Sequence, residues 1–283
     1  MEIEKKYIDL HVHSTASDGT YTPSEVVSYA AEKNLYAIAL TDHDTIDGIS
    51  EARQAALEQG DRLIVIPGIE ISADFHGTDI HILGLNIDYT NKEFLRKIDE
   101  CKRLRIERNK KMIQKLNALG FPITEETVSQ RYGKKASITR AHFARYLLDE
   151  GYVKTKEEAF KKYLNKGAPC YIPRTQMTPE EAISVILKAG GHPVLAHPLL
   201  YKLDRDMVLK LIGYLKELGM EGIEGIYSLN SSEDDAFLLK TAKMYGLYIT
   251  GGSDFHGTNK PDIDMGVGKG NLLIPKEILN NIL

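Results

Sequence analysis

Short apolar segments alternate with amphipathic segments along most of the chain. The apolar segments are four to nine residues long and rich in Ile, Val, Leu and Ala, which is typical of buried strands. The expected strands are Tyr7–Val12, Tyr36–Leu40, Arg62–Ile69, Asp79–Ile87, Pro193–Ala196, Gly222–Tyr227 and Leu247–Thr250. Repeated strand–helix units predict an α/β protein with a mainly parallel sheet, closed or open.

The amphipathic segments between these strands carry helix start signals. Thr22-Pro23-Ser24-Glu25 and Thr178-Pro179-Glu180-Glu181 each place an N-cap threonine, an N1 proline and an N3 glutamate in order. The expected helices cover residues 23–34, 46–59, 180–189, 204–218 and 232–245.

The strand pattern stops between about residues 91 and 175. One long basic helix over 91–119 is expected there, followed by shorter helices over 124–131, 139–150 and 155–165. We interpret this region as a helical insertion, so that residues 1–90 and 176–283 form the two parts of one barrel.

Charge is distributed unevenly between these parts. The chain has 283 residues, 42% of them hydrophobic, and a net charge of −4. Residues 92–166 hold 20 Lys/Arg and 10 Asp/Glu, whereas the remainder holds 16 and 30. This asymmetry indicates two surfaces with different roles, and the basic one fits a lid for a polyanionic substrate. The alternative is a solvated, lysine-rich helical surface.

The sequence offers little sign of membrane or disulfide chemistry. Apolar runs stay well below the roughly 18–20 residues of a membrane span, and a signal-peptide pattern is lacking, so we expect a cytoplasmic protein. Cys101 and Cys170 form no metal or redox spacing and are expected to be idle thiols.

Candidate chemistry begins on the first strand, at Asp9-Leu10-His11-Val12-His13. Alternation along a strand places Asp9, His11 and His13 on one face, where two imidazoles can converge on one ion. Alone, such a pair is a weak signal, and two partly exposed strand histidines are the more common explanation. Further histidines and carboxylates, however, fall on or just after other strands, mostly where active sites of α/β barrels assemble. They are His43, Glu70, His81, His197, Asp254 and His256.

These residues predict a metal centre. Imidazole and carboxylate without thiolate suit Zn²⁺, Mn²⁺ or Fe²⁺. Because one ion takes about four to six ligands, the set is too large for a single ion, and we expect two or three divalent ions.

Five motifs carry a family resemblance, and they occur in this order: Asp-Leu-His-Val-His-Ser at 9–14, Thr-Asp-His-Asp at 41–44, Pro-Gly-Ile-Glu at 67–70, Ala-His-Pro at 196–198 and Gly-Ser-Asp-Phe-His at 252–256. They resemble the PHP (polymerase and histidinol phosphatase) family, and the helical segment resembles its TrpH-like and nucleoside 3′,5′-bisphosphate phosphatase branch. The resemblance implies a distorted (β/α)7 barrel with a three-ion site at its rim.

The resemblance also implies a ligand set for each ion. The first ion is expected at His11, His13, Glu70 and Asp254, the second at Glu70, His81 and His197, and the third at Asp18, His43 and His256. Asp9, Asp42 and Asp44 are expected to orient ligands or contact substrate. Catalysis would then act through the ions held by His11, His13, Glu70, His197 and Asp254.

The expected reaction is phosphate-ester hydrolysis. Two ions that share a carboxylate lie roughly 3.5–4 Å apart and lower the pKa of a bridging water, so that a hydroxide can attack phosphorus. Ser137-Ile138-Thr139-Arg140 resembles a family segment whose arginine contacts phosphate. Ser137, Arg140 and Arg174 are therefore expected at the substrate, the alternative for each arginine being an ion pair within the insertion.

The expected substrate is a small nucleotide, either a nucleoside 3′,5′-bisphosphate or short RNA degraded by a 5′→3′ exonuclease. Relatives often have a histidine near the substrate that this chain lacks in Ser228-Leu229-Asn230-Ser231-Ser232. This difference weakens the inference of the substrate from the family resemblance. The alternatives are a histidinol-phosphate phosphatase and a non-catalytic metal-binding regulatory module. An obligate protein partner is not implied.

Overall fold

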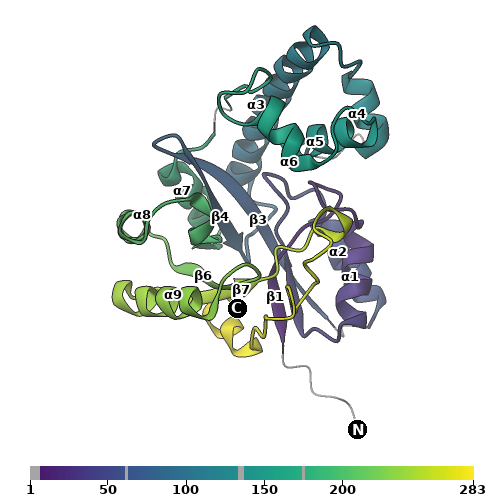
Figure 1. Ribbon diagram of the computed structural model, residues 1–283. Coiled ribbons are helices and arrows are strands. Elements are labelled where there is room, and N and C mark those ends of the chain that lie inside the picture. Colours follow the sequence, from purple (N-terminus) through teal and green to yellow (C-terminus); the bar gives the residue numbers. More distant parts are fainter. Residues whose placement is uncertain (1–6, 61–62, 133–136, 174–175) are drawn as a thin grey trace.

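A computed structural model describes residues 7–60, 63–132, 137–173 and 176–283. Its seven-stranded sheet has the strands in sequence order. They are β1 (Ile8–Val12), β2 (Ala37–Leu40), β3 (Ile64–Phe75), β4 (Thr78–Leu85), β5 (His192–Leu195), β6 (Gly222–Tyr227) and β7 (Tyr248–Gly252). A parallel bridge between Val12 and Phe255 joins the two ends of the sheet, so the sheet curls into a nearly closed barrel (Figure 1). The predicted α/β barrel class is confirmed.

The strand β4 is the reversed member of the sheet. It pairs antiparallel with both β3 and β5, whereas the other neighbouring strands pair in parallel. The turn between β3 and β4 is His76-Gly77, and both residues have positive φ angles (50° and 83°), as tight hairpin turns require. Pairing within this hairpin carries β3 on to Phe75, six residues past the expected strand end at Ile69.

Five helices pack around the sheet at the expected places. They are α1 (Pro23–Glu32), α2 (Ile49–Glu58), α7 (Pro179–Lys188), α8 (Arg205–Glu217) and α9 (Ser232–Tyr245). Thr22 and Thr178 both form the predicted capping boxes. A separate apolar cluster, which includes Ile8, Leu10 and Leu83, joins side chains of β1 to β5. Ile8 and Leu10 alternate along β1, so the cluster lies on one face of the sheet.

The region after β4 is helical, as expected. It contains α3 (Lys92–Ala118), α4 (Glu125–Tyr132), α5 (Arg140–Asp149), α6 (Lys156–Ala159) and a π-helical turn (Phe160–Leu164). These helices have their own apolar cluster, which includes Met112, Phe143 and Leu147, and they stand together at the top of Figure 1. Division of the chain at 91 and 175 stays a prediction.

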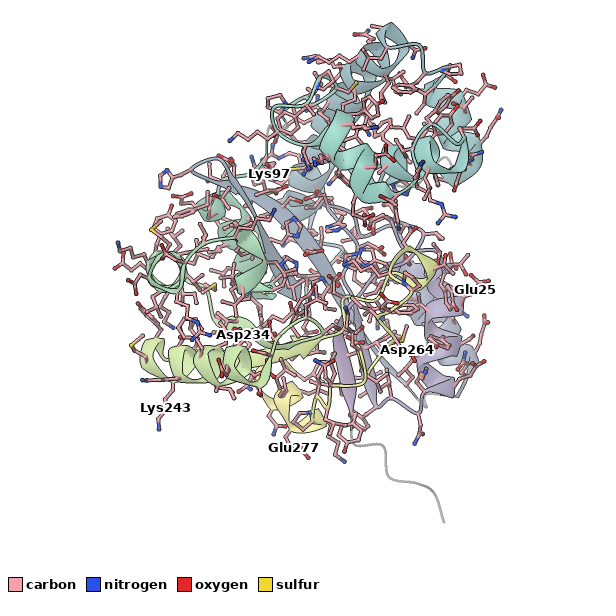
Figure 2. The ribbon with its side chains drawn as sticks, in the orientation of Figure 1. Glu25, Lys97, Asp234, Lys243, Asp264 and Glu277 are labelled. Atoms are coloured by element: carbon pink, nitrogen blue, oxygen red, sulfur yellow. The ribbon has the colours of Figure 1, made fainter. Side chains whose placement is uncertain are left out.

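Ion pairs connect α3 to the barrel. Lys97, near the start of α3, lies 3.1 Å from Glu181 of α7 (Figure 2). Deeper in the structure, Arg105 of α3 pairs with Asp44, and both side chains are buried. Across the described residues, no helix combines the length and the apolar character that crossing a bilayer demands.

Candidate metal centre

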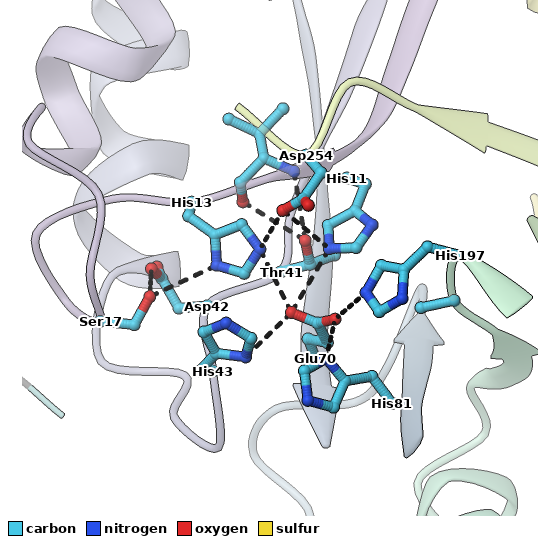
Figure 3. Close-up of polar contacts among 12 residues, drawn as sticks. His11, His13, Ser17, Thr41, Asp42, His43, Glu70, His81, His197 and Asp254 are labelled. Carbon is cyan, nitrogen blue, oxygen red and sulfur yellow. Dashed lines mark hydrogen bonds and ion pairs between the residues drawn. The ribbon is translucent and has the colours of Figure 1, made fainter. Parts of the chain in front are cut away.

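The nine predicted ligands gather at one end of the barrel. Figure 3 shows several of their side chains pointing toward one another from separate strands and loops. His81 lies in the first half of β4, opposite Ser72 of β3. Because β4 is reversed, this half of the strand lies at the same end as the carboxyl ends of the parallel strands. The set consists of His11, His13, Asp18, His43, Glu70, His81, His197, Asp254 and His256.

Glu70 lies at the centre of the cluster. Its side chain is buried, and its two oxygens face different groups of imidazoles. Oε2 lies 2.9–3.4 Å from one nitrogen of each of three rings, and Oε1 lies 2.7 and 3.0 Å from nitrogens of two others. The three rings at Oε2 belong to His11, His13 and His43, and the two at Oε1 belong to His81 and His197. Glu70 therefore has the placement expected of a carboxylate that bridges two ions.

Two further carboxylates complete the cluster. Asp254 Oδ1 lies 3.4 Å from His13 Nε2 and 3.3 Å from His256 Nδ1. Asp18 Oδ1 lies 3.2 Å from His256 Nε2 and 3.8 Å from His43 Nε2. Asp18 was expected from family resemblance alone, and the loop that carries it brings its carboxylate to these rings.

The buried polar atoms of the cluster fit a set of cations. Within the described chain, six of them lack a hydrogen-bond partner, although five of the six lie within 3.4 Å of a carboxylate oxygen or ring nitrogen of the cluster. Leaving a buried polar atom unpaired costs about 1–3 kcal/mol, so native proteins rarely do so without another partner such as an ion. The atoms are His11 Nε2, His13 Nε2, Asp18 Oδ1, His43 Nδ1, Glu70 Oε2 and His197 Nδ1.

Three groups of donor atoms are compact enough to hold an ion, with all atoms in a group within 4.8 Å of one another. The groups are His11, His13 and Glu70; His43, Glu70 and His81; and His13, Asp18, His43 and His256. The second group contains His43 where the prediction has His197. The division of ligands between individual ions therefore stays a prediction.

Electrostatics shifts the pKa values of His43 and His256 in opposite directions. Burial opposes charge on His43, but the carboxylates of Glu70 and Asp18 raise its pKa to about 9. Burial and the nearby Lys260 instead lower the pKa of His256 to about 4. Although burial also opposes ionisation of Glu70, the imidazoles of His43 and His81 hold its pKa well below its usual range. Neighbouring groups with opposed pKa shifts are typical of functional sites.

Glu224 supports the cluster and was missed by the sequence reasoning. It is buried on β6, accepts a hydrogen bond from His11 Nδ1 at 2.9 Å, and accepts another from the His197 backbone N–H at 2.8 Å. Such a carboxylate fixes which ring nitrogen is left for an ion. The available signal was a single acidic residue inside the apolar strand segment Gly222–Tyr227.

Two residues bound to Asp254 were also missed. Tyr227 donates a hydrogen bond to Asp254 Oδ2 at 2.7 Å, and Lys260 Nζ lies 2.5 Å from the same oxygen.

A glycine allows close packing beside the cluster. Gly252 is the last residue of β7, and a Cβ atom there would lie 2.2 Å from the Cβ of His11. Only glycine therefore allows β7 to approach β1 this closely.

Asp9 orients backbone loops, whereas Asp42 reaches an imidazole through the hydroxyl of Ser17, which lies 3.4 Å from His13 Nδ1 (Figure 3). Asp9 accepts hydrogen bonds from the backbone N–H groups of Ser253 and Gly266, both at 2.8 Å. The register of β1 against β2 shifts between Asp9 and Val12, which interrupts the simple alternation expected for this strand. Asp42 accepts from the hydroxyl of Ser17 at 2.6 Å.

A cavity of about 480 Å³ adjoins the cluster. Asp18, His43 and His81 contribute to its wall from the barrel, and Arg105, Arg108 and Arg140 contribute from the helical region. The predicted substrate residue Arg140 is thus at the cavity, where it pairs with Asp79 at 3.3 Å.

The other predicted substrate residues are placed differently. Ser137 is buried, and its backbone N–H donates to Ala16 at 2.8 Å. Asp44 is also buried, and it accepts from the Ser72 N–H at 2.9 Å in addition to pairing with Arg105. Asp44 therefore positions Arg105. Arg174 lies outside the described residues.

The fold agrees with the comparisons to known proteins. The sequence model of the PHP domain matches residues 9–170, which is more than half of the chain. The chain belongs to the PHP domain family. The predicted family and the predicted class of phosphoester-hydrolysing enzyme are confirmed.

Particular relatives are similar over nearly the whole length. A 5′-3′ exoribonuclease of Haemophilus influenzae is 40% identical and covers 89% of this chain and 90% of its own. A 3′,5′-nucleoside bisphosphate phosphatase of Chromobacterium violaceum is 36% identical, and the alignment covers 92% of this chain and 90% of that protein. A solved metal-dependent phosphoesterase of Bifidobacterium adolescentis superposes with a TM-score of 0.87 at 31% identity, covering 100% of this chain and 97% of that one.

Proposed function

We propose that this protein hydrolyses phosphate esters of small nucleotides, namely nucleoside 3′,5′-bisphosphates or the 5′ end of short RNA. One observation carries the proposal: buried ligand atoms that have no hydrogen-bond partner among the described residues lie beside a cavity that three arginines also line. The named activities of the Haemophilus and Chromobacterium relatives support the same substrate class.

Two or three divalent ions, Mn²⁺, Fe²⁺ or Zn²⁺, are proposed to occupy the nine-residue cluster. Bound ions of this kind activate water and neutralise charge on phosphoryl oxygens. The protein holds the ligands in place, with Glu70 shared between imidazole groups and Glu224 orienting His11 and the backbone of His197.

Arginines of the helical region are proposed to bind the substrate phosphates. Arg140 is a third exposed, pairs with Asp79 and lies over the ring of Tyr171 at 5.9 Å. A phosphate can replace the carboxylate partner, because guanidinium groups bind both anions through paired hydrogen bonds. Arg105 and Arg108 are buried along the same wall, which favours a substrate with more than one phosphate.

Histidinol phosphate remains the second candidate substrate because family members of that kind share the metal site. Histidinol phosphate carries one phosphate and a cationic amine. A cavity lined by three arginines therefore favours it less than a substrate with more than one phosphate. A metal-binding module without activity is disfavoured because imidazole or carboxylate occupies every matched ligand position.

A substrate comparison tests the proposal. The Mn²⁺-loaded protein is incubated with adenosine 3′,5′-bisphosphate, a 5′-phosphorylated tetraribonucleotide and histidinol phosphate, and released phosphate and nucleotides are measured. We expect kcat/KM to be highest for one of the first two. Faster turnover of histidinol phosphate, with both nucleotides ignored, would reject the proposal.

Arg140→Ala is expected to weaken substrate binding and leave the chemistry intact. A hydrogen bond to a charged group contributes about 1.5–3 kcal/mol, so KM should rise roughly 10- to 100-fold with little change in kcat. Arg205→Ala is the matched control, because Arg205 also pairs with an aspartate at 3.3 Å and lies over an aromatic ring, but on α8. A fall in kcat with unchanged KM in the Arg140 variant would contradict the assigned role.

A further inference from the structure

A single hydroxyl group links the helical region to the carboxylate of Asp18. Thr139 is buried, and its Oγ1 donates a hydrogen bond to Asp18 Oδ2 at 3.0 Å. The other oxygen, Oδ1, is the one that faces the imidazoles and lacks a hydrogen-bond partner among the described residues. The two oxygens of this carboxylate are thus divided between the helical region and the proposed cation site.

The same hydroxyl also starts a helix. Thr139 is the N-cap of α5, and its Oγ1 accepts a hydrogen bond from the Ala141 N–H at 3.1 Å. His142 Nδ1 also lies 3.3 Å from this hydroxyl, but it already accepts from the Thr139 N–H at 2.9 Å. The Asp18 carboxylate lies closer and can only accept, so we assign the hydroxyl hydrogen to Asp18 while an oxygen lone pair caps α5. Orientation of the Asp18 carboxylate and the start of α5 therefore depend on the same atom.

Two other contacts hold the helical region against the loop that carries Asp18 and against the neighbouring residue Asn259. The Ser137 N–H donates to the carbonyl of Ala16 at 2.8 Å. Lys156 Nζ of α6 donates to the carbonyl of Asn259 at 2.7 Å, and the side chain of Asn259 donates to the backbone carbonyl of Asp18 at 2.8 Å. These contacts position the backbone around Asp18, whereas Thr139 is the described residue of the helical region that donates a hydrogen bond to its carboxylate.

We propose that Thr139 is a positioning residue that couples the helical region to the cation site of Asp18, His43 and His256. The inference rests on the proposed function, because it takes these three residues as ligands. Residues that hydrogen-bond to a metal-ligating side chain change the affinity for the metal. Coupling between ion binding and docking of α5 is reciprocal. An ion at this site should stabilise the docked position of α5, and the docked α5 should strengthen binding of that ion.

The coupling also bears on substrate. Arg140 follows Thr139 directly and lines the cavity beside the cluster. Filling of the Asp18 site and placement of the phosphate-binding arginine are therefore linked through one residue. Loss of the Thr139 hydroxyl is expected to weaken both the binding of the ion and the binding of the substrate phosphate.

Thr178 provides a matched control for the simpler role of a helix cap. It forms the same kind of capping box at the start of α7, where its hydroxyl accepts from the Glu181 N–H. Thr178→Val removes a cap with no contact to the cation site among the described residues, while Thr139→Val removes a cap together with the bond to Asp18. Thr139→Ser keeps both functions of the hydroxyl.

The first test is a calorimetric titration of the metal-stripped full chain with Mn²⁺. We expect Thr139→Val to weaken one class of bound ions roughly 10- to 100-fold and to leave the others unchanged. Thr139→Ser and Thr178→Val should bind like the unsubstituted protein. Unchanged binding by Thr139→Val, or equal weakening by Thr178→Val, overturns the coupling alone. If the unsubstituted protein binds no Mn²⁺, the proposed function itself fails as well.

A second test needs no variant and therefore holds even if Thr139→Val does not fold. Hydrogen exchange of the unsubstituted chain is measured with and without Mn²⁺. We expect Mn²⁺ to slow exchange in α5 more than in α9, which lies outside the helical region. Equal effects on the two helices would overturn the proposal.

Discussion

Replacing Glu70 with glutamine is expected to lower phosphate-ester turnover by about a thousandfold or more. Glutamine keeps the size of the side chain but removes the charge that five imidazoles face. Weaker binding of two ions should cost several kcal/mol of transition-state stabilisation, and about 4 kcal/mol corresponds to that loss in rate. The measurements are kcat with adenosine 3′,5′-bisphosphate and metal content of the purified variant.

Two other glutamates make the comparison specific. Glu224→Gln affects a residue that orients His11, so metal affinity should fall less, by roughly 10- to 100-fold. Glu221→Gln changes a carboxylate that lies 2.6 Å from His192 outside the cluster, and activity should remain unchanged. Near-normal turnover in Glu70→Gln, or an equal loss in all three variants, would contradict the central position of Glu70.

Asp44→Asn is expected to destabilise the protein by about 3 kcal/mol, because it leaves the buried guanidinium of Arg105 without that counter-charge. Asparagine is the suitable replacement, since residue 44 has a φ of 50° and asparagine tolerates the left-handed region. For a chain of this size the melting temperature should fall by about 6–12 °C. Scanning calorimetry on the metal-stripped protein measures the effect.

The neighbouring pair of Lys102 and Asp47 is the control. It also joins α3 to the loop after β2, at 2.7 Å, but its side chains are considerably more exposed. Exposed pairs contribute about 0–1 kcal/mol, so Asp47→Asn should change the melting temperature little. If both variants lost stability equally, the buried pair would not be the principal attachment of α3.

Most residues of the cluster could be predicted from the sequence because they lie in short motifs at strand ends, whereas Asp18 was expected from the family resemblance alone. Alternation along β1 and the position of Thr41–Asp44 after β2 were sufficient to place imidazoles at one rim. His81 is different, since it reaches the rim only because β4 is reversed. Direction of a strand depends on pairing with distant segments and on a two-residue turn, and neither is visible in an apolar run.

Two of the residues that the sequence reasoning missed act through contacts between distant parts of the chain. Glu224 is separated from His11 by 213 positions and Tyr227 from Asp254 by 27, whereas Lys260 lies in a loop six positions after Asp254. A single charged residue in a strand or loop carries no local pattern that identifies its partner. Arg105 was likewise hidden within a basic helix, and only the packing of α3 shows that this arginine faces inward and not into solvent.

Metal removal and reloading test the central claim most directly. The purified protein is stripped with a chelator, bound metal is quantified, and hydrolysis of adenosine 3′,5′-bisphosphate is followed as Mn²⁺ is added back. We predict no turnover in the stripped protein and recovery that reaches its plateau at two or three bound ions per chain. Full activity in the metal-free protein, or inactivity after complete loading, would contradict the account.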